Sequence, residues 1–297
     1  MKKIAIIAVI FIFLIFISFG GAYLITKDDF DTGDKVAIVE VRGLISSAQS
    51  EGLFEVTGAN PETIRRQIEK AENDPSVKAI VIKINSPGGT IVASEAISES
   101  IKNAEKPTVA WLGEIAASGG YYAASATDYI VADRGTMTGS IGVIFMFPQY
   151  DRLLDKIGVE MRVFKAGEFK DIGSPFRNMT ESEEQIVDEW VQSAYDDFIE
   201  VVASNRGLSS EYVREIAEGN IYTGKRAVEL ELADETGTFQ DAIKIAGHMG
   251  GIDGEPTTIE YTQRGFFRDF VGVTASQFGY GFARGLLSLE KTNGPSY

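Results

Sequence analysis

Ser118 is the best candidate for a nucleophile in this sequence. It stands in the run Ala-Ala-Ser-Gly-Gly at residues 116–120, between a strand-like segment and a stretch of small residues. A hydroxyl at the start of a helix gains from the positive end of the helix dipole, but it needs a base before it can attack a carbonyl. The same position suits a plain helix N-cap, so the residue types leave a catalytic and a structural interpretation open.

A second chemical feature is the turn Ser-Pro-Gly-Gly at residues 86–89, which ends an apolar strand-like segment. At the carboxyl ends of parallel strands the loops converge on the usual ligand crevice, and consecutive glycines let backbone N–H groups approach a ligand closely. Two such donors form an oxyanion hole, which stabilises a transition state. Gly88 and Gly89 are equally compatible with a simple tight turn.

The composition restricts the base that could activate a serine. The 297 residues include one His and no Cys, which excludes a cysteine nucleophile, disulfides, thiolate metal sites and sites with several His ligands. The single imidazole, His248, stands at the expected end of a helix, where it commonly caps carbonyl groups. A buried lysine is the remaining base able to serve a serine near neutral pH. Lys165 and Lys170 share a glycine-punctuated loop, and nothing local separates them.

The charge balance argues against nucleic-acid partners. The chain has 28 Lys and Arg against 43 Asp and Glu, a net charge of −15. Affinity for nucleic acid comes largely from cations that neutralise phosphates. We therefore expect no nucleic-acid partner, and the chemistry outlined above requires no metal, nucleotide or organic cofactor.

Strand-like and helix-like segments alternate along the body of the chain. Strands are expected at residues 36–41, 77–84, 107–112, 129–132, 141–145 and 257–261. Helices are expected at residues 61–71, 90–103, 121–126, 180–206, 209–218, 224–232 and 238–246. This alternation is typical of βαβ units, so the sequence predicts an α/β fold with a mostly parallel sheet.

The N-terminal segment predicts a membrane anchor. Residues 4–26 are 23 consecutive uncharged positions, enough for a helix to span the hydrocarbon core of a bilayer. Lys2 and Lys3 precede this run and three aspartates follow it, which indicates a cytoplasmic N-terminus and an extracytoplasmic body. A cleaved signal peptide is the alternative, because small residues at 20–22 resemble a cleavage site.

These patterns divide the chain into four parts. We expect a transmembrane anchor at residues 1–26, a polar linker at 27–35, an α/β catalytic domain at 36–250 and a C-terminal segment at 251–297. The tail from Gly265 is rich in aromatic residues and glycine. An oligomer contact, a membrane-surface segment and a poorly ordered end all remain open for it.

Several motifs, taken in order, resemble the signal peptide peptidase A family in its short, single-repeat form. They are Asn-Ser-Pro-Gly-Gly at 85–89, Ala-Ala-Ser-Gly-Gly-Tyr-Tyr at 116–122, Thr-Met-Thr-Gly-Ser-Ile-Gly-Val at 136–143, Lys-Asp-Ile-Gly-Ser-Pro at 170–175 and Tyr-Thr-Gly-Lys-Arg-Ala at 222–227. The resemblance runs from about residue 36 to about residue 246 and implies a membrane-anchored serine protease with the Clp protease/crotonase-like fold.

Carried onto this sequence, the resemblance assigns the residues of a Ser/Lys dyad. The family nucleophile falls on Ser118 and the general-base lysine on Lys170, which separates Lys170 from Lys165. Ser140 matches the serine that orients the lysine amine.

The resemblance also assigns an oxyanion hole and an assembly. Gly89 matches the first backbone donor, Gly119 is expected as the second, and Gly88 shapes the turn. Family members cleave signal-peptide remnants and other apolar peptides at the membrane. The resemblance to single-repeat members implies a homo-oligomeric ring in which neighbouring subunits supply the serine and the lysine.

Two other functions remain as alternatives at this point. A crotonase-like acyl-CoA enzyme would use the same oxyanion hole, although the expected export of the body from the cytoplasm counts against coenzyme A as a substrate. An inactive ring that binds peptides is the non-enzymatic alternative, and the intact motifs around Ser118 and Lys170 argue against it.

Overall fold

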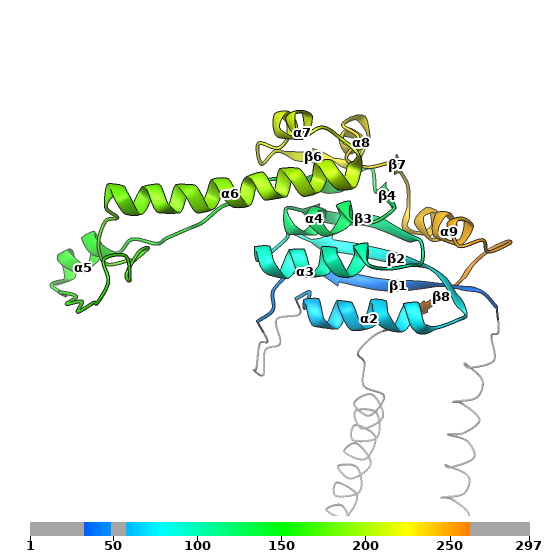
Figure 1. Cartoon of the computed structure of the whole chain (residues 1–297), viewed down its shortest axis with the longest axis horizontal. Coiled ribbons are helices and arrows are strands. Elements are labelled where there is room, and N and C mark those ends of the chain that lie inside the picture. Colours follow the sequence, from blue (N-terminus) through cyan, green and yellow to red (C-terminus); the bar gives the residue numbers. More distant parts are fainter. Residues whose placement is uncertain (1–32, 49–57, 262–297) are drawn as a thin grey trace, which may run out of the picture. The chain divides into compact units, whose positions relative to one another are not determined.

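A mixed β-sheet organises the computed structural model, which describes residues 33–48 and 58–261 (Figure 1). Within these residues the sheet has eight strands in the order β6-β5-β3-β2-β1-β8, and β4 pairs with both β3 and β7. The strands are β1 (Lys35–Arg42), β2 (Val77–Ser86), β3 (Thr108–Ala117), β4 (Tyr129–Ala132), β5 (Met137–Gly139), β6 (Ile221–Thr223), β7 (Glu235–Thr236) and β8 (Thr257–Glu260). All pairings are parallel except that of β5 with β6.

Helices cover both faces of this sheet. They are α2 (Pro61–Asn73), α3 (Ile91–Lys102), α4 (Gly119–Ser125), α5 (Asp151–Ile157), α6 (Glu181–Arg206), α7 (Ser210–Ile216), α8 (Gly224–Glu229) and α9 (Phe239–Met249). Helices α2, α3 and α4 pack side by side, and α2 and α4 also contact the strands (Figure 1). Helix α9 packs its buried residues against alternate residues of β1, β2 and β3, such as Val36, Ala79 and Val109.

Burial on both faces explains the sequences of the central strands. Residues that alternate with those facing α9, such as Ala37 and Ile80, are also fully buried. The sequences of β1 and β2 are therefore almost continuously apolar. This pattern is characteristic of parallel sheets with helices on each side. The expected α/β fold with a mostly parallel sheet is confirmed.

Local signals set the start of two major helices as expected. The Asn60 side chain accepts hydrogen bonds from the N–H groups of Glu62 and Thr63, and Pro61 occupies the first turn of α2. Helix α6 begins with a capping box between Thr180 and Glu183.

The strand expected at residues 141–145 is wrong. The strand that pairs with the end of β3 is β5, and its last residue Gly139 lies opposite Ala117. Gly139 and Ser140 then adopt positive φ values of 79° and 49°. Since extended backbone requires negative φ, the ladder ends there, and the apolar residues that follow form an irregular segment.

The last expected strand is present, and two further expected segments lie outside the described residues. The strand expected at 257–261 is present as β8 and pairs in parallel with β1, while β6, β7 and α5 are short elements that the sequence did not predict. The proposed anchor at residues 1–26 and the aromatic tail from Gly265 lie outside the described residues. None of the helices in the described part of the chain is long and apolar enough to cross a bilayer.

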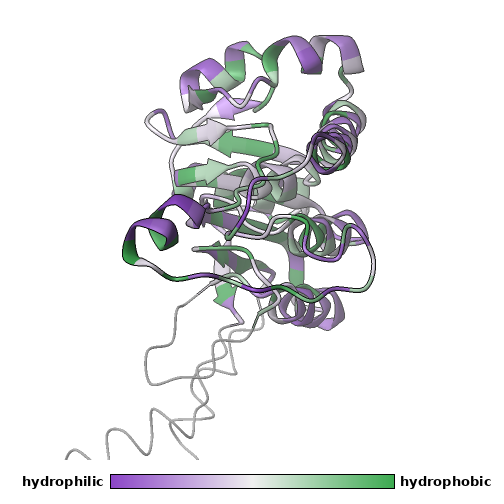
Figure 2. Ribbon diagram, turned by 90° about the vertical axis from the view of Figure 1, so that its left-hand side faces the viewer, coloured by the Kyte–Doolittle hydropathy of each residue, from purple (hydrophilic) through white to green (hydrophobic). Residues whose placement is uncertain are grey.

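A long excursion between β5 and α6, here called the arm (residues 145–178), carries α5 away from the sheet to the N-terminal end of α6 (Figure 1). The arm folds on itself: the N–H of Tyr150 donates to the carbonyl of Pro175, and Gly173 packs against the ring of Phe147. Hydrophobic segments alternate with hydrophilic ones along it, whereas the helices around the sheet show mainly hydrophilic outer faces (Figure 2).

An ionic cluster ties the arm to the start of α6. The Arg177 guanidinium donates to the carboxylates of both Asp171 and Glu183. These bonds lower the pKa of Asp171 and raise that of Arg177. The hydrogen bonds from Arg177, followed by that from the backbone of Thr180, hold the pKa of Glu183 at about 2, below its usual 4.5.

The lowered pKa of Glu183 predicts acid-sensitive stability. Because the folded state favours the charged carboxylate, its contribution is complete above about pH 4.5 and is lost as the pH falls towards about 2. Glu183→Gln is expected to reduce stability at neutral pH and to flatten the acid limb, measured by urea unfolding of the detergent-solubilised chain. Glu184→Gln removes the neighbouring charge as a control. Parallel pH curves for wild type and Glu183→Gln would contradict the prediction.

Candidate active site

Ser118 occupies a strained turn between β3 and α4. Its φ and ψ are 51° and −123°, a conformation that costs a non-glycine residue about 1–3 kcal/mol. The surrounding backbone holds it there: the Ser118 N–H donates to the carbonyl of Gly139 at 2.9 Å, and its carbonyl accepts from the N–H of Tyr122 at 2.9 Å. The hydroxyl forms no capping bond to α4. Ser118 thus occupies the N-cap position of α4, but its side chain does not cap the helix.

The glycines expected to form an oxyanion hole lie beside Ser118. A Cβ atom on Gly88, whose φ is 99°, would lie 2.7 Å from the Gly119 nitrogen, and one on Gly119 would lie 3.2 Å from the Gly89 nitrogen. The N–H groups of Gly89 and Gly119 form no hydrogen bond with any other part of the described chain. Two unpaired donors next to a hydroxyl are the geometry that binds a developing oxyanion.

Two cavities meet at Ser118. One, of about 440 Å³, lies between α3, α4 and α6 and is lined mainly by apolar side chains, among them Ile91, Val92, Ile144 and Phe198. The other, of about 500 Å³, adjoins it at Ser118 and includes Pro87, Ser140, Val143 and Tyr195. A chain laid through both cavities would pass over the serine with room for side chains on each side.

Tyr122 forms a wall of the first cavity. Its ring packs against that of Phe198 at 5.0 Å between centroids. Burial first, and then the carboxylates of Glu95 and Asp197, raise the pKa of Tyr122 to about 12. The phenol is therefore neutral at physiological pH and cannot serve as the base for Ser118.

Ser140 reaches the second cavity through a strained backbone of its own. Its φ is 49°, and its N–H donates to the carbonyl of Asn220 at 2.7 Å. The hydroxyl has no hydrogen-bond partner among the described residues, and it lines the same cavity as Ser118. The structure thus places Ser118, Ser140, Gly88, Gly89 and Gly119 close to one another.

The two candidate lysines have different surroundings. Lys165 is engaged: its amine donates to the carbonyl of Glu168 and pairs with Asp171. Lys170 is exposed on the arm, and its amine forms no ion pair or hydrogen bond within the described residues. It lines neither cavity that borders Ser118. One chain therefore does not bring Lys170 to Ser118.

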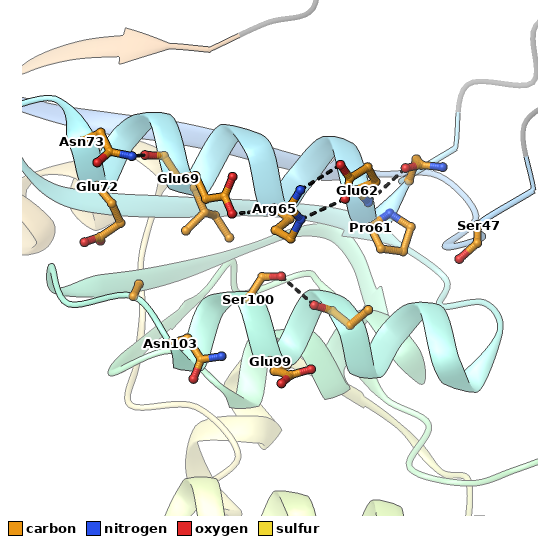
Figure 3. Close-up of a pocket in the computed structure, with 14 residues that line it drawn as sticks. Ser47, Pro61, Glu62, Arg65, Glu69, Glu72, Asn73, Glu99, Ser100 and Asn103 are labelled. Atoms are coloured by element: carbon orange, nitrogen blue, oxygen red, sulfur yellow. Dashed lines mark hydrogen bonds and ion pairs between the residues drawn. The ribbon is translucent and has the colours of Figure 1, made fainter.

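The remaining candidates lie elsewhere. His248 is exposed in the last turn of α9 and lines neither cavity at Ser118. A groove of about 700 Å³ between α2 and α3 is lined mainly by polar residues and contains none of the candidate residues (Figure 3). There Arg65 bridges Glu62 and Glu69, so these groups already satisfy one another. The described residues contain no cluster of side chains suited to a metal ion.

Sequence reasoning assigned no role to two buried hydroxyls at this site. Ser86 ends β2 and contacts the turn that carries Gly88, while Thr138 donates to the carbonyl of Ala116 at 2.7 Å. Both stand in the motifs at 85–89 and 136–143, and a polar residue in an otherwise buried strand end was the available signal.

Comparison with known families decides the class of the protein. The model of peptidase family S49 matches residues 100–251, and the Clp protease model matches residues 53–135. The chain belongs to peptidase family S49. As a member of the signal peptide peptidase A group within it, this S49 chain is a serine protease with a Clp protease/crotonase-like domain.

Relatives agree with the S49 assignment over most of the chain. A protein of Methanocaldococcus jannaschii whose name assigns it to the proteases is 35% identical, covering 99% of this chain and 98% of its own. A protein of Enterococcus faecium whose name assigns it to signal peptide peptidase SppA is 37% identical over 88% of this chain and 76% of its own. Protease 4 of Haemophilus influenzae is 33% identical over 86% of this chain, which spans only 43% of that longer protein.

A solved structure supports the fold of the S49 chain. A membrane-bound stomatin-specific protease aligns with a TM-score of 0.53, covering 77% of this chain and 98% of its own. Sequence identity is 16%, so this likeness concerns the fold alone.

Gly89→Ala tests the oxyanion site. A Cβ at this position would lie 1.8 Å from the carbonyl oxygen of Ile45, so the turn must shift and the Gly89 N–H must move. We expect kcat/KM for peptide cleavage to fall by at least about 100-fold. Gly135→Ala is the control, because its Cβ meets only an ordinary contact with Asp133 at 3.6 Å. Equal activity of the two variants would exclude Gly89 from the site.

Proposed function

We propose that this protein is a membrane-anchored serine endopeptidase that uses a Ser118/Lys170 dyad shared between neighbouring subunits. The observation that carries the proposal is the Ser118 hydroxyl, which forms no capping bond to α4. It is held in a strained turn beside the N–H groups of Gly89 and Gly119, which form no hydrogen bond within the described residues. Together with a general base, a hydroxyl, two oxyanion donors and adjoining cavities are the parts needed to cleave a bound peptide.

In the proposed reaction Lys170 accepts and then returns a proton. The neutral amine of Lys170 takes the proton of the Ser118 hydroxyl as its oxygen attacks the peptide carbonyl. The N–H groups of Gly89 and Gly119 bind the oxyanion, and the lysine then gives the proton to the leaving amine. A water molecule then attacks the acyl-enzyme, with the same lysine as its base, and releases Ser118. Ser140 accepts or donates a hydrogen bond that orients the lysine in the second cavity.

The surface of the arm supports a dyad shared between subunits. Large apolar side chains on and near the arm are exposed in the single chain, with Phe164 95%, Met146 82% and Ile144 78% exposed. Such a concentration of exposed apolar groups is typical of an interaction surface. A second copy seated against it would bury these groups, and the second cavity, which includes Ser140, has room for a lysine from that copy. Head-to-tail contacts of this kind close into rings.

The sequence outside the described residues supports the location. The apolar run at residues 4–26 anchors the protein in a bilayer, with the N-terminus cytoplasmic and the catalytic domain extracytoplasmic. We propose remnants of signal peptides and other apolar or unfolded peptides as substrates. The apolar lining of the first cavity and the name of the Enterococcus faecium relative favour that substrate class.

A complementation experiment tests the shared dyad. Ser118→Ala and Lys170→Ala are each expected to lower kcat by at least about 10³-fold against an apolar peptide. When the two variants are unfolded, mixed in equal amounts and refolded together, about one quarter of the sites recover both groups, because each site draws on two subunits.

Lys156→Ala supplies the control, since it removes another arm lysine that forms no ion pair with the described residues, and it should leave activity intact. Activity in either inactive variant alone would refute the dyad. Failure of the mixture to regain activity, with both variants assembled as the wild type is, would refute sharing between subunits.

Membrane anchoring predicts a simple fractionation result. The full chain is expected in the membrane fraction, and a chain that begins at Asp34 is expected to be released. In sealed right-side-out vesicles, an added protease should reach the arm. Protection of the arm, with cleavage only after lysis, would reverse the proposed topology.

A further inference from the structure

The turn that presents Gly89 is fixed by few contacts. On one side the main chain of Ile45 holds it, donating to the carbonyl of Gly88 at 2.9 Å and accepting from the N–H of Thr90 at 3.0 Å. On the other side a side chain holds it: the N–H of Gly88 donates to the hydroxyl oxygen of Ser86 at 3.0 Å. Among the described residues, no other side chain forms a hydrogen bond with Gly88 or Gly89.

Ser86 is well placed to act as a clamp. It is fully buried at the end of β2, and its hydroxyl donates to the carbonyl of Gly43 at 2.6 Å while accepting from Gly88. Gly43 follows β1, the neighbouring parallel strand. The hydroxyl therefore uses both its donor and an acceptor position to join the end of one strand to the turn that follows the next.

Packing leaves the turn little freedom to compensate for the loss of this clamp. A Cβ on Gly88 would approach both Ser118 and Gly119, and a Cβ on Gly120 would lie 2.7 Å from the Ser86 carbonyl oxygen. The two loops of the site thus meet mainly through backbone atoms and the Cβ of Ser118. A small rotation of the peptide that links Gly88 and Gly89 redirects the Gly89 N–H, the group that meets the oxyanion.

We infer that Ser86 is a positioning residue for catalysis: its hydroxyl holds the N–H of Gly88, in the peptide just before the one that carries the Gly89 N–H. Together with the bond from Ile45 to the Gly88 carbonyl, it aims the Gly89 N–H at the oxyanion formed on the substrate. This inference rests on the proposed function, because it assigns a role within that oxyanion hole. Ser86 lines neither of the cavities that border Ser118. Its loss is expected to weaken binding of the transition state while leaving the cavities that bind the ground state unchanged.

A buried hydroxyl elsewhere in the chain offers a matched control. Ser125 is also fully buried, donates to the carbonyl of Tyr122 at 2.8 Å and accepts from the Asn205 side chain at 3.2 Å. It is the last residue of α4, whereas Ser118 precedes the first, and it lines neither cavity at the site. Ser125→Ala therefore removes one buried hydroxyl with one donated and one accepted bond, as Ser86→Ala does.

The test compares the two variants in the full chain in detergent. For Ser86→Ala we expect kcat against a peptide substrate to fall between about 10- and 100-fold with little change in KM. Ser125→Ala should retain the wild-type kcat. Thermal unfolding of both is measured to show that they lose comparable stability.

Inhibitor binding gives a readout that a purely structural role would not move. A peptide aldehyde forms an adduct with Ser118 that carries an oxyanion, whereas the peptide amide of the same sequence does not. Ser86→Ala should weaken inhibition by the aldehyde by a factor close to the loss in kcat and leave inhibition by the amide unchanged.

Equal kcat for Ser86→Ala and Ser125→Ala would overturn the inference. So would a parallel loss of affinity for the aldehyde and the amide. If Ser86→Ala does not fold, Ser86→Cys is measured instead: a lowered kcat at constant KM supports the role, and an unchanged kcat overturns it. A wild-type chain that cleaves no peptide, or a Ser118→Ala variant that remains active, would refute the proposed function itself.

Discussion

The parallel pairing of β2 with β3 determines where the candidate catalytic groups lie. Its register is regular until Ile84 lies opposite Leu112, and then Ser86 lies opposite Ala116. Two steps along β2 thus match four along β3, so β3 bulges before it ends. Because of this bulge both strands end at the same level, and the turns that follow them meet: Gly88 and Gly89 from one, Ser118 and Gly119 from the other.

The site stores strain on both of its serines. Three non-glycine residues of the described chain have positive φ, and two of them, Ser118 and Ser140, line the same cavity. The N–H of Ser118 donates to the carbonyl of Gly139, and the N–H of Ser140 donates to the carbonyl of Asn220. These bonds to neighbouring segments, rather than the residues' own backbone preferences, fix the two conformations. Strained residues that cluster at one cavity are characteristic of a functional site, where surrounding structure imposes geometry that the free chain avoids.

Much of the scaffold was predictable because its signals are local. The apolar runs of β1 and β2 and the caps of α2 and α6 each depend on a few adjacent residues. The run at 141–145 has strand-like residue types, yet the backbone reversal at Gly139 and Ser140 removes it from the sheet. Local residue types also could not separate Lys165 from Lys170, since the difference is an ion pair with Asp171 and depends on how the arm folds. Ser86 went unassigned for a related reason: its partner Gly43 lies 43 residues away along the chain.

The placement of β8 has a consequence for how the domain is connected to its ends. Strand β8 pairs with β1, so the chain enters the sheet and leaves it through adjacent strands at one edge. Ser118 and the turn after β5 belong to strands on the opposite side of β2. Both connections of the described domain to the rest of the chain therefore lie on the β1–β8 side of the sheet, whereas Ser118 lies on the other side of β2. A change in the length of either connection would therefore leave the pairing of β2 with β3, and the turns that hold the serine, unaltered.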